Sequence, residues 1–211
     1  METTLEKARK DPDSMKGRIL AVARRVFGEY GFHGTTMRMI AHEVGIDIST
    51  LHYHWGEKKD LYEAVIIDIN NDLREKLIEV EGVIHGLPRG ERVAISLDMM
   101  TDYLFDHPEI SNLILFRYIA KTRHDVTLDF RVPEFTRDIV HSMGLPEDKD
   151  NVGQSMISII TVMNSLHNFI SGEEFFRPMV KASRDRYKRL VKETLKSIYV
   201  VAFAENGMGM K

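Results

Sequence analysis

Apolar residues recur at intervals of three and four along most of this 211-residue chain, and no segment alternates convincingly between apolar and polar residues. Such spacing places apolar side chains on one face of a helix, whereas a half-buried strand would need a period of two. Ile19, Val22, Val26 and Tyr30 mark one such face. The spacing therefore predicts an all-α protein of about nine helices.

The nine helices are separated by glycine, proline and capping residues. Thr35 is the expected cap of the second helix and Asp47 that of the third, which Gly56 ends. The helices are expected at about residues 16–30, 36–45, 48–54, 58–80, 91–106, 109–121, 134–143, 150–170 and 184–204. Residues 1–14 read as a loose polar tail and residues 205–211 as a flexible one.

Composition places the chain among ordinary proteins of the cytoplasm. It has no cysteine, which excludes disulfides and thiolate metal sites and suits a reducing compartment. The first 14 residues lack the apolar stretch of a signal peptide, and the longest purely apolar run, Tyr199 to Ala204, is too short to span a bilayer. The net charge is −3, but residues 1–60 carry ten Lys and Arg against nine Asp and Glu. This weak positive bias is compatible with phosphate binding.

Two short helices joined by Gly45-Ile46-Asp47 have the pattern of a helix-turn-helix. The apolar residues of the second and third helices can pack against the first helix. Ser49, Thr50, His52 and Tyr53 are then left facing outward. Small hydroxyls beside aromatic rings can reach base edges, thymine methyls and phosphate oxygens.

The segment ILAVARRVFGEYGFHGTTMRMIAHEVGIDISTLHYHWGEKKDLYEAV resembles the N-terminal domain of TetR-family transcriptional regulators. The match covers roughly a fifth of the chain; the rest resembles the family only in being helical and of suitable size. The matching residues are Phe27, Gly31, Thr35, Thr36, Ile40, Ala41, Gly45, Thr50, Leu51, His54, Lys58 and Leu61. The resemblance implies a three-helix DNA-binding domain over residues 15–60 and a larger helical domain, residues 61–204, for effector binding and dimerisation. It also implies a repressor that a small molecule releases from DNA.

The resemblance also indicates which side chains contact DNA. Arg38, Ser49 and Thr50 are the expected base contacts, and Tyr53, His54 and Lys58 the expected phosphate contacts. Thr36 and His52 complete the expected DNA-binding set, although His52 stands where the family usually has tyrosine.

His54 and Trp55 also have structural interpretations. His54 can be a core histidine that links helices instead of a phosphate ligand. Trp55 is expected in the core, because its spacing from Leu51 places it on the inner face. A metal site formed by His52 and His54 is disfavoured, because residues two apart on a helix do not face each other. No metal or cofactor is expected.

Broad apolar faces on the helices at about 150–170 and 183–204 predict a homodimer that buries them in a four-helix bundle. A dimer would present two reading helices to a near-palindromic operator. A purely intramolecular core is the alternative. The candidate effector pocket consists of polar and aromatic residues of the middle helices, which can equally be plain core: Met99, Tyr103, Phe116, Asn164 and His167.

A helical metal-dependent phosphohydrolase is the competing hypothesis, because such sites use a His-Asp pair like His124-Asp125. With nine histidines in the chain, one such dipeptide carries little weight. No glycine-rich phosphate loop, nucleophile elbow or HExxH motif is present. The sequence therefore favours a regulator over an enzyme.

Overall fold

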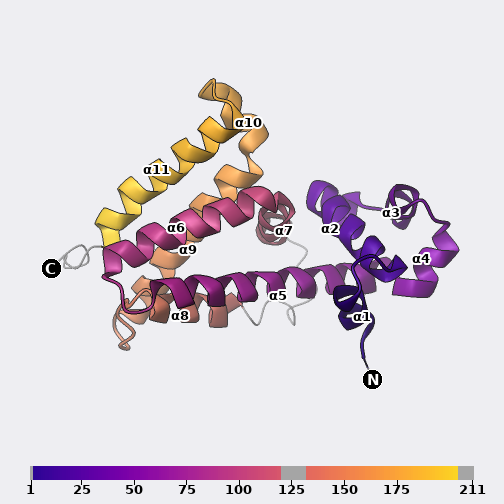
Figure 1. The fold of residues 1–211 in the computed structure, drawn as a ribbon, viewed down its shortest axis with the longest axis horizontal. Helices are drawn as coiled ribbons and strands as arrows, with labels where there is room; N and C mark the ends of the chain where they lie inside the picture. Colours follow the sequence, from indigo (N-terminus) through magenta and orange to yellow (C-terminus); the bar gives the residue numbers. More distant parts are fainter. Residues whose placement is uncertain (1, 120–131, 204–211) are drawn as a thin grey trace. The chain divides into compact units, whose positions relative to one another are not determined.

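The computed structural model describes residues 2–119 and 132–203, which form eleven helices and no strand (Figure 1). The all-α prediction is confirmed, with two helices more than expected. The described residues divide into two compact units: residues 2–72 with 112–119, and residues 73–111 with 132–203. His124, Asp125 and the expected tail at 205–211 lie outside the described residues. None of the described helices is both long and apolar enough to cross a membrane.

The first unit is built around the helix-turn-helix. It contains α1 (Thr4–Lys10), α2 (Met15–Gly34), α3 (Met37–Val44), α4 (Ile48–Trp55), the first part of α5 (Lys58–Ile84) and the last part of α7 (Pro108–Ile119). Its core draws apolar side chains from each of α2 to α5: Ile19, Val26, Phe27, Ile40, Val44, Leu51, Trp55, Leu61 and Val65. The predicted three-helix domain with its helix-turn-helix, followed by a long helix, is therefore present.

The N-cap of α3 is Thr36, so the prediction of Thr35 was wrong by one residue. The Thr36 hydroxyl accepts a hydrogen bond from the Met39 amide at 3.2 Å. Thr35 is fully buried, and its hydroxyl donates to the carbonyl oxygen of Gly31 at 2.8 Å. Either threonine has the hydroxyl that capping requires, but the Thr35 hydroxyl is already bonded to the carbonyl oxygen of Gly31 in α2.

Helix α1 lies where a loose polar tail was expected. Thr3 and Glu6 form a capping box, with the Glu6 carboxylate accepting from the Thr3 amide at 2.7 Å. The helix is tied to α5 by Arg9, whose guanidinium donates to Asp68 at 2.6 Å and to Asp72 at 2.8 Å. These ion pairs join residues about sixty positions apart, so local sequence patterns do not predict them.

Arg24 of α2 binds the same two aspartates, 2.7 Å from Asp68, which completes a network that we call the Arg9/Arg24 cluster. Burial alone would lower the pKa of Arg24, but the bonds and charges of Asp72 and Asp68 outweigh it and raise the pKa. Asp68 is almost completely buried. The cluster therefore joins α1, α2 and α5 within the first unit through desolvated charges.

The second unit contains the rest of α5 with α6 (Arg89–Asp106), α8 (Val132–Ser142), α9 (Val152–Ser171), α10 (Glu173–Met179) and α11 (Arg184–Phe203), and the first residues of α7. Helices α6 and α11 lie side by side (Figure 1). Three aspartates of α6 face three lysines of α11 in what we call the α6–α11 row: Asp98, Asp102, Asp106, Lys188, Lys192 and Lys196. The shortest pair, Lys192 to Asp102, is 2.8 Å.

Helix α10 is the second addition to the predicted set, and it lies between the helices expected at about residues 150–170 and 184–204. It has seven residues, contains Pro178 near its end and buries none of them. Glu173 pairs with Arg177 one turn later at 3.4 Å, and it also pairs with Arg184 of α11 at 3.5 Å. Phe176 also meets the Phe169 ring of α9 edge to face, with centroids 6.0 Å apart, so charge pairs and one aromatic contact support this helix.

Candidate nucleic-acid interface

The turn between α3 and α4 fixes how α4 leaves the scaffold. Gly45 ends α3 with φ +79°, a left-handed conformation that favours glycine. Asp47 then caps α4, as predicted, by accepting the Thr50 amide at 2.7 Å. These bonds from the backbone and hydroxyl of Thr50 lower the pKa of Asp47, so the cap is ionised at neutral pH.

Helix α4 has one buried face and one open face. Leu51 and Trp55, four residues apart, are buried in the first unit, which confirms the predicted core position of Trp55. On the other face, Ser49 is exposed and Tyr53 is 85% exposed. An exposed phenol and an exposed hydroxyl can donate and accept hydrogen bonds. This face is therefore chemically suited to phosphates and base edges.

Thr50 and His52 already have partners within the protein. The Thr50 hydroxyl donates to Asp47 Oδ2 at 2.9 Å, so only its oxygen lone pairs and methyl group are free to contact DNA. His52 Nδ1 lies 2.9 Å from the Gly56 carbonyl oxygen, and it must be the donor because that oxygen can only accept. Glu57 lies 3.8 Å from the same nitrogen. His52 is thus oriented by the turn that follows α4.

His54 is half buried, and its Nδ1 is buried without a hydrogen-bond partner among the described residues. Its ring meets that of Tyr53 edge to face, with centroids 5.2 Å apart. A buried Nδ1 cannot reach a phosphate, so any phosphate contact of His54 has to use Nε2.

Two further candidates lie at the beginnings of helices. Arg38 is exposed in the first turn of α3 and has no ion-pair partner in the described part of the chain. Lys58 begins α5, and its ammonium lies 4.4 Å from the centroid of the Phe32 ring. The first unit therefore contains all eight predicted DNA-binding residues, and Thr36, Arg38, Ser49 and Tyr53 are the exposed ones.

The five residues proposed for an effector pocket come from three helices, α6, α7 and α9, and differ in burial. Phe116 belongs to the first unit, where its ring lies 3.4 Å from the position a Cβ would take on Gly31. Asn164 is exposed on α9. Met99 and Tyr103 are half buried on α6, whereas His167 is buried and its Nδ1 lies 3.0 Å from Ser111 Oγ. Burial lowers the pKa of His167 to about 4, so this side chain is neutral at physiological pH.

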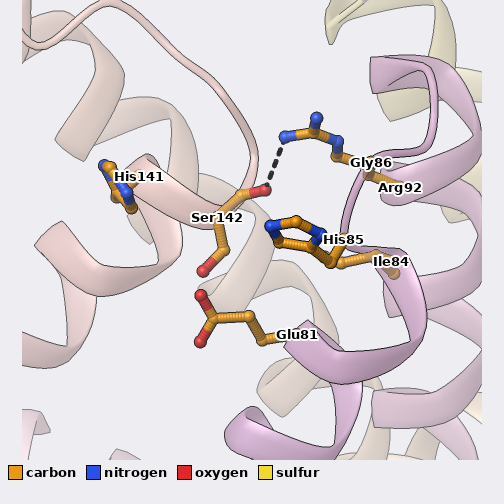
Figure 2. A pocket seen from close by; sticks show the side chains of 7 residues that line it. All are labelled: Glu81, Ile84, His85, Gly86, Arg92, His141 and Ser142. Carbon is orange, nitrogen blue, oxygen red and sulfur yellow. Dashed lines mark hydrogen bonds between the residues drawn. The ribbon is translucent and has the colours of Figure 1, made fainter.

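The second unit has a small open pocket where α5 and α8 end (Figure 2). Its volume is about 260 Å³, and it is lined by Glu81, Ile84, His85, Gly86, Arg92, His141 and Ser142. Arg92 is committed to the backbone, donating to the Leu87 carbonyl at 2.6 Å and to that of Ser142 at 3.1 Å. No group of three metal-ligating side chains is placed to hold an ion among the described residues. None of the predicted effector residues lines this pocket.

Sequence reasoning missed two partner residues, Phe32 beneath Lys58 and Ser111 beside His167. The partners are 26 and 56 positions apart, respectively. Such contacts depend on how helices pack, and no local pattern marks them.

Comparisons with known proteins identify the fold and the family. Residues 19–65 match the family model described as bacterial regulatory proteins, tetR family. An HTH-type transcriptional regulator of Staphylococcus aureus (strain MW2) is 40% identical over 186 residues, which are 86% of this chain and 98% of that protein. The regulator BetI of Escherichia coli (strain UMN026) is 28% identical over 92 residues, and the matched part is only 45% of BetI.

Solved structures share the architecture at lower identity. The ketosteroid transcriptional regulator KstR2 of Mycobacterium tuberculosis superposes with a TM-score of 0.66 at 15% identity, covering 90% of this chain and 95% of that chain. FadR of Bacillus subtilis, solved in complex with stearoyl-CoA, gives 0.55 at 13% identity, covering 85% and 97%. With the helix-turn-helix in place and a relative matched over nearly its whole length, this chain belongs to the TetR family of DNA-binding transcriptional regulators.

Proposed function

We propose that the protein binds a near-palindromic operator by inserting α4 into the major groove. The observation that carries the proposal is the division of α4 into a buried face, Leu51 and Trp55, and an open face, Ser49 and Tyr53. A helix held by one face can present the other to base edges. An operator on the chromosome as the target implies a cytoplasmic protein.

The proposed contacts follow from exposure and chemistry. Arg38 and Ser49 are free to contact bases, and Thr50 adds its methyl group, which suits thymine. Tyr53, Lys58 and the Nε2 atom of His54 are proposed to contact phosphates. His52 can donate to a phosphate through Nε2 only when its ring is doubly protonated, because Nδ1 already donates to Gly56. Thr36 is the weakest member, because its hydroxyl already accepts from Met39.

We further propose that the protein acts as a homodimer through α9 and α11. These helices are joined by a hydrogen bond between Ser165 and Tyr199 at 2.8 Å. Large apolar side chains remain exposed on them, with Ile157 at 58%, Ile198 at 53% and Val201 at 71%. Exposed apolar side chains on neighbouring helices favour burial against a second copy. Asn164 lies on the exposed face of α9, two turns from Ile157, so we reassign it from the effector pocket to this surface.

The proposal includes repression that a small-molecule effector relieves. The two α4 helices of a dimer must be spaced to fit successive major grooves. A ligand that binds more tightly to a dimer with a different spacing shifts the population to that conformation and so lowers the affinity for DNA. The complex of FadR with stearoyl-CoA supports effector binding in this fold. Within the second unit, the neutral His167 and its partner Ser111 are the buried polar pair that could orient such a ligand.

Mapping the sites that the protein occupies in the genome of the producing organism tests the proposed function. We expect a small number of near-palindromic sites, which the protein binds several orders of magnitude more tightly than random-sequence duplex. Arg38→Ala should weaken binding to those sites by ~1–3 kcal/mol and change binding to random duplex much less. Occupancy without a shared sequence would contradict specific reading.

Sedimentation of the full-length protein tests the dimer separately. We expect wild type to sediment as a dimer and a variant with both Ile157→Asp and Val201→Asp to sediment as a monomer, because the substitutions bury charge in the proposed interface. A monomeric wild type, or a variant that stays dimeric, would remove α9 and α11 from the interface.

A further inference from the structure

Lys58, the first residue of α5, does not extend freely into solvent. Its Nζ lies over the face of the Phe32 ring, 4.4 Å from the centroid. A cation within about 6 Å of a ring centroid is attracted by the negative face of the π system. Partial burial of the side chain lowers the pKa of Lys58. The ammonium therefore has a defined resting position in the absence of DNA.

Phe32 itself is held by other aromatic rings. It lies parallel to Phe27 with centroids 6.5 Å apart and tilted against Tyr62 at 4.9 Å. Phe27 is fully buried and meets Tyr62 edge to face at 5.0 Å. Gly31, with φ +66°, bends α2 immediately before Phe32. The ring beneath Lys58 is thus a fixed platform of the first unit.

An ammonium group has three N–H donors, and a ring beneath it occupies only one side. The remaining donors are available to phosphate oxygens, at a helix N-terminus whose dipole also attracts anions. We propose that Phe32 is a positioning residue for DNA binding, holding the Lys58 ammonium where it meets a backbone phosphate. This inference rests on the proposed function and adds a residue outside the predicted DNA-binding set.

Lys59 provides a matched comparison on the same turn of α5. Its ammonium lies 3.6 Å from the carboxylate of Glu63, one turn along the helix, and Lys59 is exposed whereas Lys58 is half buried. Removing Lys59 also removes one positive charge from the beginning of α5. The Phe32 ring lies beneath the Lys58 ammonium, so we expect the contribution of Lys58 to depend on that ring.

A double-mutant cycle tests the inference with full-length protein and a random-sequence duplex, where binding depends on phosphates rather than base reading. Lys58→Met should reduce the slope of log affinity against log salt by about one unit. Phe32→Leu should weaken binding about two- to fivefold in wild type and have no effect in the Lys58→Met background. Phe32→Tyr, which keeps the ring, should bind like wild type, and Phe32→Leu should keep its full effect in a Lys59→Met background.

Three results would overturn the inference. The first is an equal loss of duplex affinity from Phe32→Leu with and without Lys58, and the second is tighter duplex binding by Phe32→Leu. The third is an unchanged salt slope in Lys58→Met. The second would mean that the ring competes with phosphate instead of presenting the lysine. Failure of the proposed function is distinct, because wild type itself would then show no salt-dependent binding to any duplex.

A spectroscopic measurement avoids dependence on the folding of the leucine variant. The methylene protons next to Lys58 Nζ should show an upfield ring-current shift in the NMR spectrum of wild type. We expect this shift to persist when duplex is added. Its loss on binding would mean that the lysine leaves the ring to reach DNA, which would overturn the inference.

Discussion

Both units join helices that are distant in the sequence by acidic and basic side chains, but the two sets of charges differ in burial. In the Arg9/Arg24 cluster the side chain of Asp68 is 5% exposed and that of Arg24 is 15% exposed. In the α6–α11 row the side chain of Asp102 is 51% exposed. Water therefore screens the carboxylate of Asp102 far more than that of Asp68. Loss of a buried carboxylate in the first unit should therefore destabilise the protein far more than loss of a lysine in the α6–α11 row.

Asp68→Asn should have the largest effect on stability. It removes the charge that faces two guanidinium groups and leaves them partly buried with only Asp72 to balance them. We expect a loss of ~3 kcal/mol in the free energy of unfolding. Urea titration followed by the fluorescence of Trp55, the single tryptophan, reports on the first unit. Unchanged stability would mean that the cluster is far more hydrated than its burial indicates.

Lys192→Met should have a smaller effect, although Lys192 contacts two aspartates, Asp98 at 3.4 Å and Asp102 at 2.8 Å. We expect a loss below ~1 kcal/mol, because partly exposed ion pairs are screened by water and salt. Urea titration followed by circular dichroism measures it, with Lys149→Met as a control for removing an exposed lysine. A loss as large as that of Asp68→Asn would contradict the comparison.

Acid should weaken the α6–α11 row by a still smaller amount. Burial alone would raise the pKa of Asp102, but Lys192 and Lys188 outweigh it and lower the pKa. A folded pKa below the unfolded one means that the contribution is complete above the unfolded value, near 4, and is lost as pH falls through the folded value. Stability measured between pH 6 and roughly pH 3 should fall less steeply in Asp102→Asn than in wild type. Parallel curves would exclude Asp102 as a source of the acid sensitivity.

Prediction from sequence succeeded where structure is decided locally. Asp47 caps α4, Gly56 follows its last residue and α5 begins at Lys58, because each depends on neighbours within four residues. The choice between Thr35 and Thr36 failed, since packing against the end of α2 decides it. Helix α1 was missed although Thr3-x-x-Glu6 is a readable capping box.

The sequence is least informative about contacts between distant residues. The pocket hypothesis grouped Phe116, Asn164 and His167 by residue type, whereas the structure shows Asn164 exposed and His167 buried. Residue type and spacing do not tell which helices become neighbours. The α6–α11 row likewise joins residues about ninety positions apart and was not predicted.

Selection of bound sequences from a random duplex library, by wild type and by Ser49→Ala, tests most directly whether α4 reads DNA. Ser49 is exposed and its loss disturbs no side-chain hydrogen bond among the described residues, whereas Thr50 supports the cap of α4. Ser96→Ala makes the same substitution on α6, outside the proposed DNA contacts and dimer helices, at a hydroxyl without a hydrogen-bond partner among the described residues, and serves as the control. We predict one near-palindromic sequence for wild type and Ser96→Ala, and altered base preference at two symmetry-related positions for Ser49→Ala. No enriched sequence, or the same sequence for all three proteins, would contradict the account.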